Sequence, residues 1–231
     1  RVRLLPRASA ALAMLLALAS ACSVRRLAVG GLSEALAGSA TAFAGEDDPE
    51  LVRGALPFAL KAMEAVLLES PDDETLLAAA SAGFGLYGYA FVQLDAEALA
   101  SRDYGRSQEL NRRALALYLR ARDYALRALE RRHPGLTARL RTRPTRAAAE
   151  LARDEVEFAY LAGGNWGLAI ALGKDDPALL ADLDAVRALL QRAVALDEGY
   201  GNGALHEAHV AERGPQFFPR LYFVGGAQRA L

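Results

Sequence analysis

The segment SQELNRRALALYLRARDYALRALERR, residues 107–132, repeats apolar side chains at the period of an α-helix and places charged side chains between them. It contains no Gly or Pro, and His133-Pro134-Gly135 closes it, since Pro and Gly end helices. Ala and Leu dominate the 53% of apolar residues in the whole chain, and β-branched residues are few, a composition that favours helices over strands. The sequence therefore predicts an all-α protein.

Helix start and stop signals extend this prediction in both directions. Asp48-Pro49 predicts an N-cap and a first-turn proline for a helix over about 49–69, which Pro57 should kink. A long apolar helix is expected over about 73–99, and these three helices should pack as antiparallel neighbours. Toward the C-terminus we expect, in order, a connector around 139–146, a helix from a cap at Asp154 to about Leu172, a helix opened by Asp175-Asp176-Pro177 and ending near Leu196, and a last helix over about 203–212.

Similar sequences end three of the expected helices. Residues 63–72 and 191–198 both resemble the end of the second helix of a tetratricopeptide repeat, and residues 127–134 are a looser copy. A new helix follows each copy, as helix-pair repeats require. The copies are about 62–65 residues apart, close to two 34-residue units. The sequence therefore predicts a degenerate tetratricopeptide-like helical repeat, an α-solenoid.

The N-terminus has the pattern of a bacterial lipoprotein export signal. Arg1, Arg3 and Arg7 accompany an apolar run over 8–19, which is too short to span a bilayer. The run ends three residues before Cys22, the only cysteine of the 231 residues. We predict that Cys22 is lipidated and that its acyl chains tether the mature protein to a membrane outside the cytoplasm. The alternatives are plain cleavage and a retained apolar N-terminus.

Four parts of the chain follow from these signals. We expect a lipoprotein signal peptide over 1–21, a lipid anchor and tether with a weak first helix over 22–45, a helical-repeat domain over 46–212 and an atypical tail over 213–231. Without residues 1–21, 24 Lys and Arg face 28 Asp and Glu, so general attraction to nucleic acid is not expected. No second membrane anchor is expected, since no later apolar run is long and free of charge or Gly clusters.

The order of several segments resembles a known family, the TatT family, the tetratricopeptide-type lipoprotein component of tripartite ATP-independent periplasmic (TRAP) transporters. The segments that carry this resemblance are ACSVRRLA at 21–28, DDPELVR at 47–53, ALPFALK at 55–61, YAFVQL at 89–94, LYLRARDY at 117–124, WGLAI at 166–170 and ALHE at 204–207. None of these segments is a catalytic signature.

The resemblance implies a periplasmic, lipid-anchored helical-repeat protein. It implies a periplasmic substrate-binding protein as partner, assembly as a homotrimer, and a small apolar or amphipathic ligand. A member of the family would continue with further helices beyond His206-Glu207, whereas Gly214-Pro215 breaks the helical pattern here. The tail over 213–231 is therefore expected to be truncated or frameshifted.

Two patches rich in glycine and aromatic residues are candidate ligand contacts, the first around Gly83, Gly85 and Gly88 and the second around Gly163, Gly164 and Gly167. Each helical glycine costs about 0.8–1 kcal/mol relative to alanine, so the glycines call for a reason. One hypothesis is a ligand channel in which glycines make room and aromatic rings form the wall; the other is close packing between helices. The candidate ligand-binding residues of the first hypothesis are Phe84, Tyr87, Tyr89, Phe91, Tyr160, Asn165 and Trp166.

No arrangement of residues predicts catalysis, a metal or another cofactor. His206-Glu207-Ala208-His209 has its histidines at i and i+3, whereas zinc proteases need i and i+4 on one helix face. The paired acids Asp47-Asp48, Asp72-Asp73 and Asp175-Asp176 all sit beside Pro at helix starts, where they act as caps. We therefore expect a protein that is not an enzyme.

The steepest charge asymmetry lies over 102–146, where 13 Arg face four acids. One interpretation is that these are solvated helix faces, paired with the acidic stretches 46–50, 69–74 and 175–184. The alternative is a docking face for an acidic partner or an anionic membrane.

Two functional hypotheses follow. The first is a lipid-anchored accessory protein of a TRAP-type transporter that binds a small apolar or amphipathic ligand or passes it to a substrate-binding partner. The second is a protein-interaction scaffold of the cell envelope with no small-molecule ligand.

Overall fold

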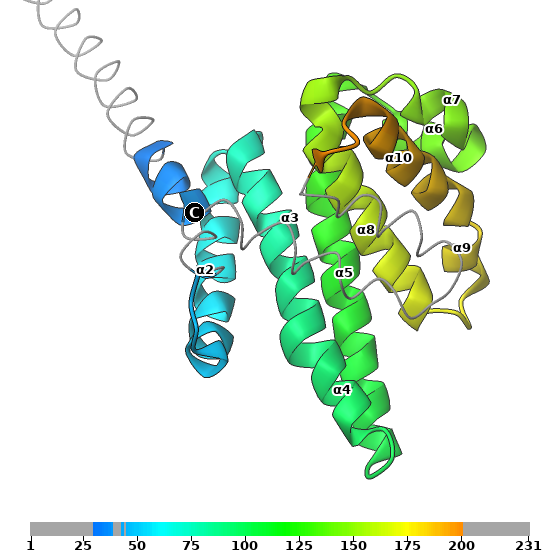
Figure 1. The fold of residues 1–231 in the computed structure, drawn as a ribbon. Helices are drawn as coiled ribbons and strands as arrows, with labels where there is room; N and C mark the ends of the chain where they lie inside the picture. The colour runs from blue at the N-terminus through cyan, green and yellow to red at the C-terminus, as the bar shows by residue number, and fades with distance from the viewer. Residues whose placement is uncertain (1–29, 39–42, 44, 201–231) are drawn as a thin grey trace, which may run out of the picture.

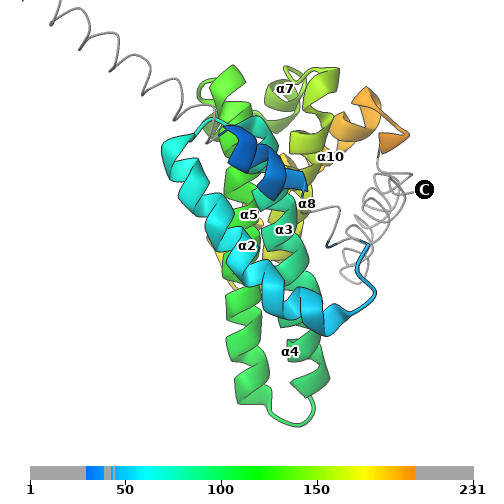
Figure 2. The ribbon, with the colours of Figure 1, turned by 90° about the vertical axis from the view of Figure 1, so that its left-hand side faces the viewer.

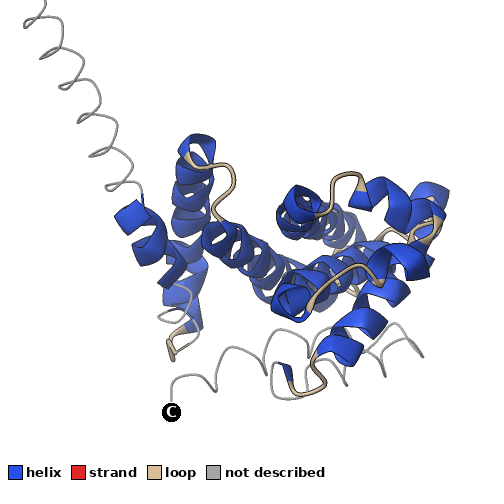
Figure 3. Cartoon of the chain, turned by 90° about the horizontal axis from the view of Figure 1, so that it is seen from above, coloured by secondary structure: helices blue, strands red, loops and turns tan. Residues whose placement is uncertain are grey.

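The computed structural model describes residues 30–38, 43 and 45–200. Every regular element within these residues is helical and none is a strand, which confirms the all-α prediction (Figures 1 and 3). The predictions for several segments fall outside the described residues: the signal peptide over 1–21, Cys22, the helix over 203–212 with its histidines, and the tail over 213–231.

The elements follow one another with short connections. Residues 30–38 are helical, as expected for a weak first helix in the tether. The remaining elements are α2 (Pro49–Glu69), α3 (Glu74–Gly88), the π-helical turn η1 (Tyr89–Gln93), α4 (Leu94–Leu99), α5 (Tyr104–Arg132), α6 (Leu136–Thr142), α7 (Pro144–Ala148), the 3-10 turn η2 (Arg153–Glu155), α8 (Val156–Leu172), α9 (Pro177–Leu180) and α10 (Leu183–Leu196).

The central helix is α5. It packs against α3 on one side and α8 on the other, α2 covers α3, and α10 covers α8 (Figure 1). The lower part of α5 continues beyond α8 and α10 as a hairpin with α4 (Figures 1 and 2). The short helices α6 and α7 lie at the opposite end, against each other and α10. The three helices predicted to be neighbours are therefore α2, the α3–α4 unit and α5.

The predicted caps explain where α2 and α3 begin. The Asp48 carboxylate accepts hydrogen bonds from the backbone N–H groups of Glu50 (2.9 Å) and Leu51 (3.2 Å). These bonds satisfy donors that have no partner within the helix. Asp73 does the same for the N–H of Leu76 at 3.0 Å. Pro57 lies inside α2, and the kink expected there remains a prediction.

The helix predicted over 73–99 is continuous but changes its winding. A π-helical turn, η1, separates α3 from α4. Together Glu74–Leu99 are long and apolar enough to cross a membrane by length and composition, with a mean hydropathy of 1.4 and 61% of the apolar window buried within the protein. Because α2, α5 and α8 all contact α3, these residues serve as a core helix of the described fold.

The connector predicted around 139–146 is wrong, because α6 and α7 occupy it. Pro144 stands at the first position of α7. A backbone N–H at this position has no acceptor within the helix, so a proline there costs no hydrogen bond. Leu140 and Ala147 are buried, so burial against the rest of the protein stabilises two helices whose local signals are weak.

Three predicted boundaries also change. Helix α5 begins at Tyr104 instead of 107, because the Asp103 carboxylate caps it by accepting from the Arg106 N–H at 2.9 Å. Asp154 is not the cap of α8; its carboxylate accepts from Arg132 at 2.7 Å, and η2 precedes the helix. The single helix expected from Pro177 is two helices, α9 and α10.

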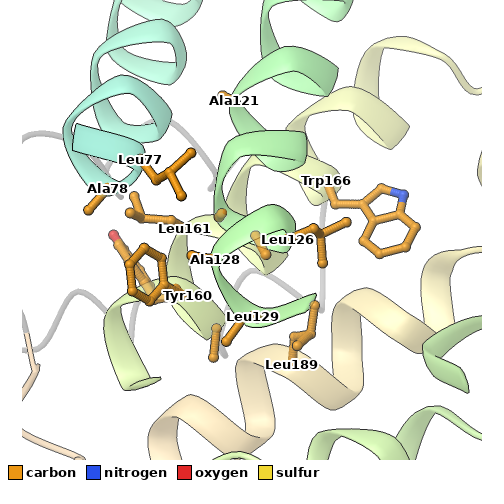
Figure 4. Close-up of a cluster of buried hydrophobic side chains, with 14 of the residues drawn as sticks. Leu77, Ala78, Ala121, Leu126, Ala128, Leu129, Tyr160, Leu161, Trp166 and Leu189 are labelled. Carbon is orange, nitrogen blue, oxygen red and sulfur yellow. The ribbon is translucent and has the colours of Figure 1, made fainter. Parts of the chain in front are cut away.

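The interior is built from the faces of α2, α3, α5, α8 and α10. Leu77, Leu129 and Leu189 are fully buried in one cluster that Figure 4 shows. Two buried polar side chains are satisfied there: Ser81 Oγ donates to the Ala121 carbonyl at 2.7 Å, and Asn165 Nδ2 donates to the Leu161 carbonyl at 2.8 Å.

Three of the helical glycines lie where neighbouring helices approach closely. A Cβ at Gly163 would be 3.0 Å from the Leu190 side chain, and one at Gly83 would be 2.7 Å from Leu60. At Gly88 it would be 3.1 Å from the ring of Tyr118. At these positions the structure supports the close-packing interpretation of the glycines.

Candidate functional site

The seven candidate ligand residues lie in different surroundings. Trp166 is fully buried, and Asn165 is buried beside it on α8. Tyr160 is buried against Tyr200, with ring centroids 5.7 Å apart. Figure 4 shows Tyr160 and Trp166 pointing in opposite directions from α8. The second patch contacts α3 outside the first patch, since Asn165 Nδ2 is 3.5 Å from the Oγ of Ser81.

The first patch divides over two sides of its helix. Tyr89 is buried in a cluster with Tyr118 of α5. Phe84, Tyr87 and Phe91 lie on another face, because positions three and seven residues apart share a helix face. The rings of Tyr87 and Phe91 are in contact, with centroids 5.7 Å apart. The structure therefore brings three of the seven candidates together.

An arginine lies over each of these three rings. The guanidinium carbon of Arg120 is 5.2 Å from the Phe84 centroid, that of Arg113 is 5.6 Å from the Tyr87 centroid, and that of Arg53 is 5.0 Å from the Phe91 centroid. Each distance is within the ~6 Å of a cation–π contact. Arg53 comes from α2, and the other two arginines come from α5. The three helices thus form a groove whose floor is aromatic and whose two walls each contribute arginines, here called the arginine–aromatic groove.

Arg53 is held at one end of the groove by a bidentate ion pair. Its Nη1 and Nη2 donate to the two carboxylate oxygens of Asp95 at 2.7 and 3.2 Å. The hydrogen bond with Asp95 raises the pKa of Arg53 further above its already high value, so the side chain stays charged. This pair joins α2 to α4 across the aromatic floor.

At the other end, Glu64 joins α2 to α5. Its carboxylate accepts from Tyr124 Oη at 2.7 Å, pairs with Lys61, and lies 3.5 Å from Arg120 Nη1. Partial burial acts to raise the pKa of Glu64, but the bonds from Lys61 and Tyr124 and the charge of Arg120 outweigh it, so the pKa is lowered. Burial, reinforced by the bond to Glu64, raises the pKa of Tyr124, so this phenol is a donor at neutral pH.

Two open cavities follow the groove. One of about 410 Å³ is lined by residues of α2, α3, η1, α4 and α5: Arg53, Tyr87, Phe91, Asp95, Ala98, Leu99, Arg106, Leu110 and Arg113. The second, of about 460 Å³, lies along α5 and is lined by Ala116, Leu119, Arg120, Asp123, Tyr124 and Arg127. Both cavities are open to solvent, and the second is lined by α5 alone, so neither encloses a ligand as a buried pocket does.

Four arginines of α5 along this groove belong to the basic segment 102–146, for which a docking face was one interpretation, but that interpretation did not separate them from the other arginines of the segment. The available signal was their spacing, because Arg106, Arg113, Arg120 and Arg127 are each seven residues apart on α5. An α-helix drifts by only about 20° per heptad, so the four positions form one stripe along the helix. The partner rings on α3 could be assigned to this stripe only from the packing of the two helices.

Other arginines of the basic segment have structural partners, as the pairing interpretation predicts. Arg132 Nη2 lies 2.6 Å from Glu74, and Arg141 Nε lies 3.1 Å from Asp182, so two of the three expected acidic stretches are used. The third is not used in this way, since Glu50 pairs at 3.3 Å with Arg53, which lies outside the basic segment.

A second polar cluster ties the end of α5 to η2. The buried Glu155 carboxylate accepts from the Ala152 N–H at 2.8 Å, and both of its oxygens lie 3.0 Å from His133 Nε2. These contacts close the connection between the two elements. Within residues 30–38, 43 and 45–200, no group of three or more His, Cys, Asp or Glu could hold a metal ion.

Comparison with known proteins identifies the family to which this chain belongs. The model of the TAtT family, described as the TRAP transporter T-component, matches residues 45–214, which include every element from α2 to α10. The chain therefore belongs to the TAtT family, as its resemblance predicted. It is also 33% identical over 206 residues to an uncharacterized protein of Treponema pallidum (strain Nichols), a match that covers 81% of this chain and 64% of the relative. The chain thus spans about two thirds of the length of that relative.

Proposed function

We propose that this protein is a non-enzymatic accessory component of a TRAP-type solute transporter, attached to the periplasmic side of a bacterial membrane by lipid on Cys22. The family match over residues 45–214 carries this proposal, since TRAP transporter components are membrane-associated bacterial proteins. The charged, apolar and small residues before Cys22 support the lipid anchor.

The described helices are arranged as a degenerate tetratricopeptide-like repeat, and the protein assembles as a homotrimer in this proposal. Support for the repeat comes from the packing order, because each long helix contacts the next along the chain: α2 with α3, α3 with α5, α5 with α8, and α8 with α10. Contacts mainly between neighbours are typical of solenoids.

The accessory component binds a small apolar or amphipathic ligand, or passes it to a periplasmic substrate-binding protein. The arginine–aromatic groove supports this part, because two of its cavities combine apolar side chains with a few charged groups. Tyr87 and Phe91 are the contact residues that the groove favours, because both are partly exposed, whereas Phe84 is buried in the core. Tyr89, Tyr160, Asn165 and Trp166 are buried between helices, so in this proposal they contribute to packing and do not contact the ligand.

A scaffold without a small-molecule ligand is the second candidate. The close approach of Leu60 to Gly83 and of Leu190 to Gly163 favours it, because packing alone accounts for these glycines.

Native mass spectrometry of a soluble form starting at Ser23, with and without the purified substrate-binding protein, tests the proposal. We expect a defined oligomer that releases a small molecule on activation and that forms a complex with the partner. Adding the released molecule at about 100 times its Kd should raise the free energy of unfolding by about 2.7 kcal/mol. A ligand-free complex with the partner would favour the scaffold. A ligand-free monomer that does not bind the partner would contradict both the accessory component and the scaffold.

A further inference from the structure

The arginine stripe on α5 is longer than a small ligand. Arg106 and Arg127 are 21 residues apart, which corresponds to about 31 Å along a helix. The groove beside it is open along this length, with one cavity around Arg106 and Arg113 and the other around Arg120 and Arg127. An elongated binding partner uses such a surface better than a compact molecule does.

Two arginines of the stripe, Arg113 and Arg127, have no ion-pair partner within the described residues, whereas the other two lie close to carboxylates. Arg106 pairs with Glu109 at 2.8 Å, and Arg120 lies 3.5 Å from Glu64. Arg113 donates to the Tyr87 hydroxyl at 3.3 Å, but neither it nor Arg127 forms an ion pair within the described part of the chain. Since a guanidinium has five N–H donors, a ring-stacked arginine still has donors for a carboxylate.

The floor of the groove offers apolar contact beside this charge. Tyr87, Phe91 and Leu99 are partly exposed, and they line the same cavity as Arg113. An apolar strip flanked by guanidinium groups at intervals of seven residues is complementary to an amphipathic helix that repeats acidic residues at the same interval.

We infer that the arginine–aromatic groove docks an acidic amphipathic helical segment of the substrate-binding partner. The inference rests on the proposed function for the identity of the partner, and it assigns the groove to a segment of that partner in place of a small ligand. Acidic side chains of the segment pair with Arg113 and Arg127, and its apolar side chains cover Tyr87 and Phe91. Complementary charge of this kind raises the association rate and makes it depend on salt.

A pair of charge-reversal variants tests the inference. Arg113→Glu/Arg127→Glu is compared with Arg143→Glu/Arg146→Glu, which makes the same change in net charge on exposed arginines outside the groove. Surface plasmon resonance measures the affinity of each form of the chain for the substrate-binding protein, and circular dichroism verifies folding. We expect the groove variant to lose at least about tenfold in affinity, mainly through a slower association rate, and the control to change by less than about twofold.

The outcomes separate this inference from the proposed function. If the wild-type chain binds the partner and both variants bind equally well, the groove is not the docking surface, although the accessory role stands. If the wild-type chain does not bind the partner, the proposed partnership fails and the docking inference fails with it. If vesicles of phosphatidylcholine and phosphatidylglycerol bind the wild-type chain, the groove variant does not, and the partner binds both, the groove is a membrane surface.

A photo-crosslinking amino acid identifies the chemistry of the bound segment. At position 87, in the groove, it should join the chain to a partner peptide that carries Asp or Glu at helical spacing. At position 104, where Tyr104 is 70% exposed at the start of α5, it serves as the control. Cross-linking of a basic peptide, or cross-linking from position 104 only, would overturn the inference.

Discussion

Arginine guanidiniums lie over aromatic rings both in the interior beside α8 and in the groove beside α2. The two sets of contacts serve different purposes. In the interior, the guanidiniums of Arg122 and Arg141 lie 4.9 and 5.7 Å from the ring of the fully buried Trp166. Both arginines are also paired with carboxylates, Arg122 with Asp123 and Arg141 with Asp182.

In the groove two of the three rings are nearer to the surface, and one of the stacked arginines has no ion-pair partner within the described residues. Tyr87 and Phe91 are partly exposed, and Arg113 contacts only the ring and hydroxyl of Tyr87 among the interactions found there. The contact between ring and guanidinium is therefore not itself a sign of function. Burial and the pairing of the arginine distinguish a structural contact from a binding surface.

The largest effect is expected from the interior. Trp166→Ala should lower the free energy of unfolding by about 3–5 kcal/mol, because it removes a fully buried ring and leaves a cavity. Urea denaturation measures this loss. Phe58→Ala on the outer face of α2, where the ring is 80% exposed, is the control and should change stability by less than about 0.5 kcal/mol. Equal losses in the two variants would show that Trp166 is not part of the packed interior.

Substitutions at two glycines should change stability by smaller amounts and in opposite directions. Gly163→Val should destabilise by about 1–3 kcal/mol, because even its Cβ would be 3.0 Å from Leu190. Gly54→Ala in α2 should stabilise by about 0.5–1 kcal/mol, because nothing lies within 4 Å of its Cβ and alanine favours the helix. Thermal unfolding followed by circular dichroism compares the two. A stabilised Gly163→Val protein would contradict the close packing of α8 on α10.

The smallest effect concerns Glu64 in the groove wall. A carboxylate whose pKa is lowered by folding stabilises the protein above its unfolded pKa, and this contribution is lost as the pH falls through the folded pKa. Between pH 7 and pH 3 the wild-type protein should therefore lose more stability than Glu64→Gln. Denaturation at several pH values measures the difference, with Glu157→Gln on the exposed face of α8 as the control. Identical pH profiles for wild type and Glu64→Gln would show that Glu64 does not link α2 to α5.

The long helices could be predicted from sequence, because their signals are local. The amphipathic period of α5 and the caps Asp48 and Asp73 lie within the helices they define. The short helices α6 and α7 were missed because their 7 and 5 residues contain Pro and Thr and depend on burial against α10. Tertiary contacts, not propensity, stabilise helices of this length.

The groove also depends on tertiary contacts, which local sequence signals do not predict. Sequence analysis selected Phe84, Tyr87 and Phe91 as candidate contacts but grouped them with Trp166, since it could not show which faces of α3 and α8 meet. The spacing of the α5 arginines was visible in the sequence, whereas their position over the rings depends on how three helices pack.

Hydrogen exchange of the chain with and without the substrate-binding protein tests the contrast between groove and interior most directly. We predict that the partner slows exchange in peptides from α3 to α4 and from α5 as far as Arg127, in the seventh turn of that helix, and leaves α8 and α10 unchanged. Slower exchange confined to α8 and α10, or no change in any peptide at a saturating partner concentration, would contradict the assignment of the groove as the binding surface.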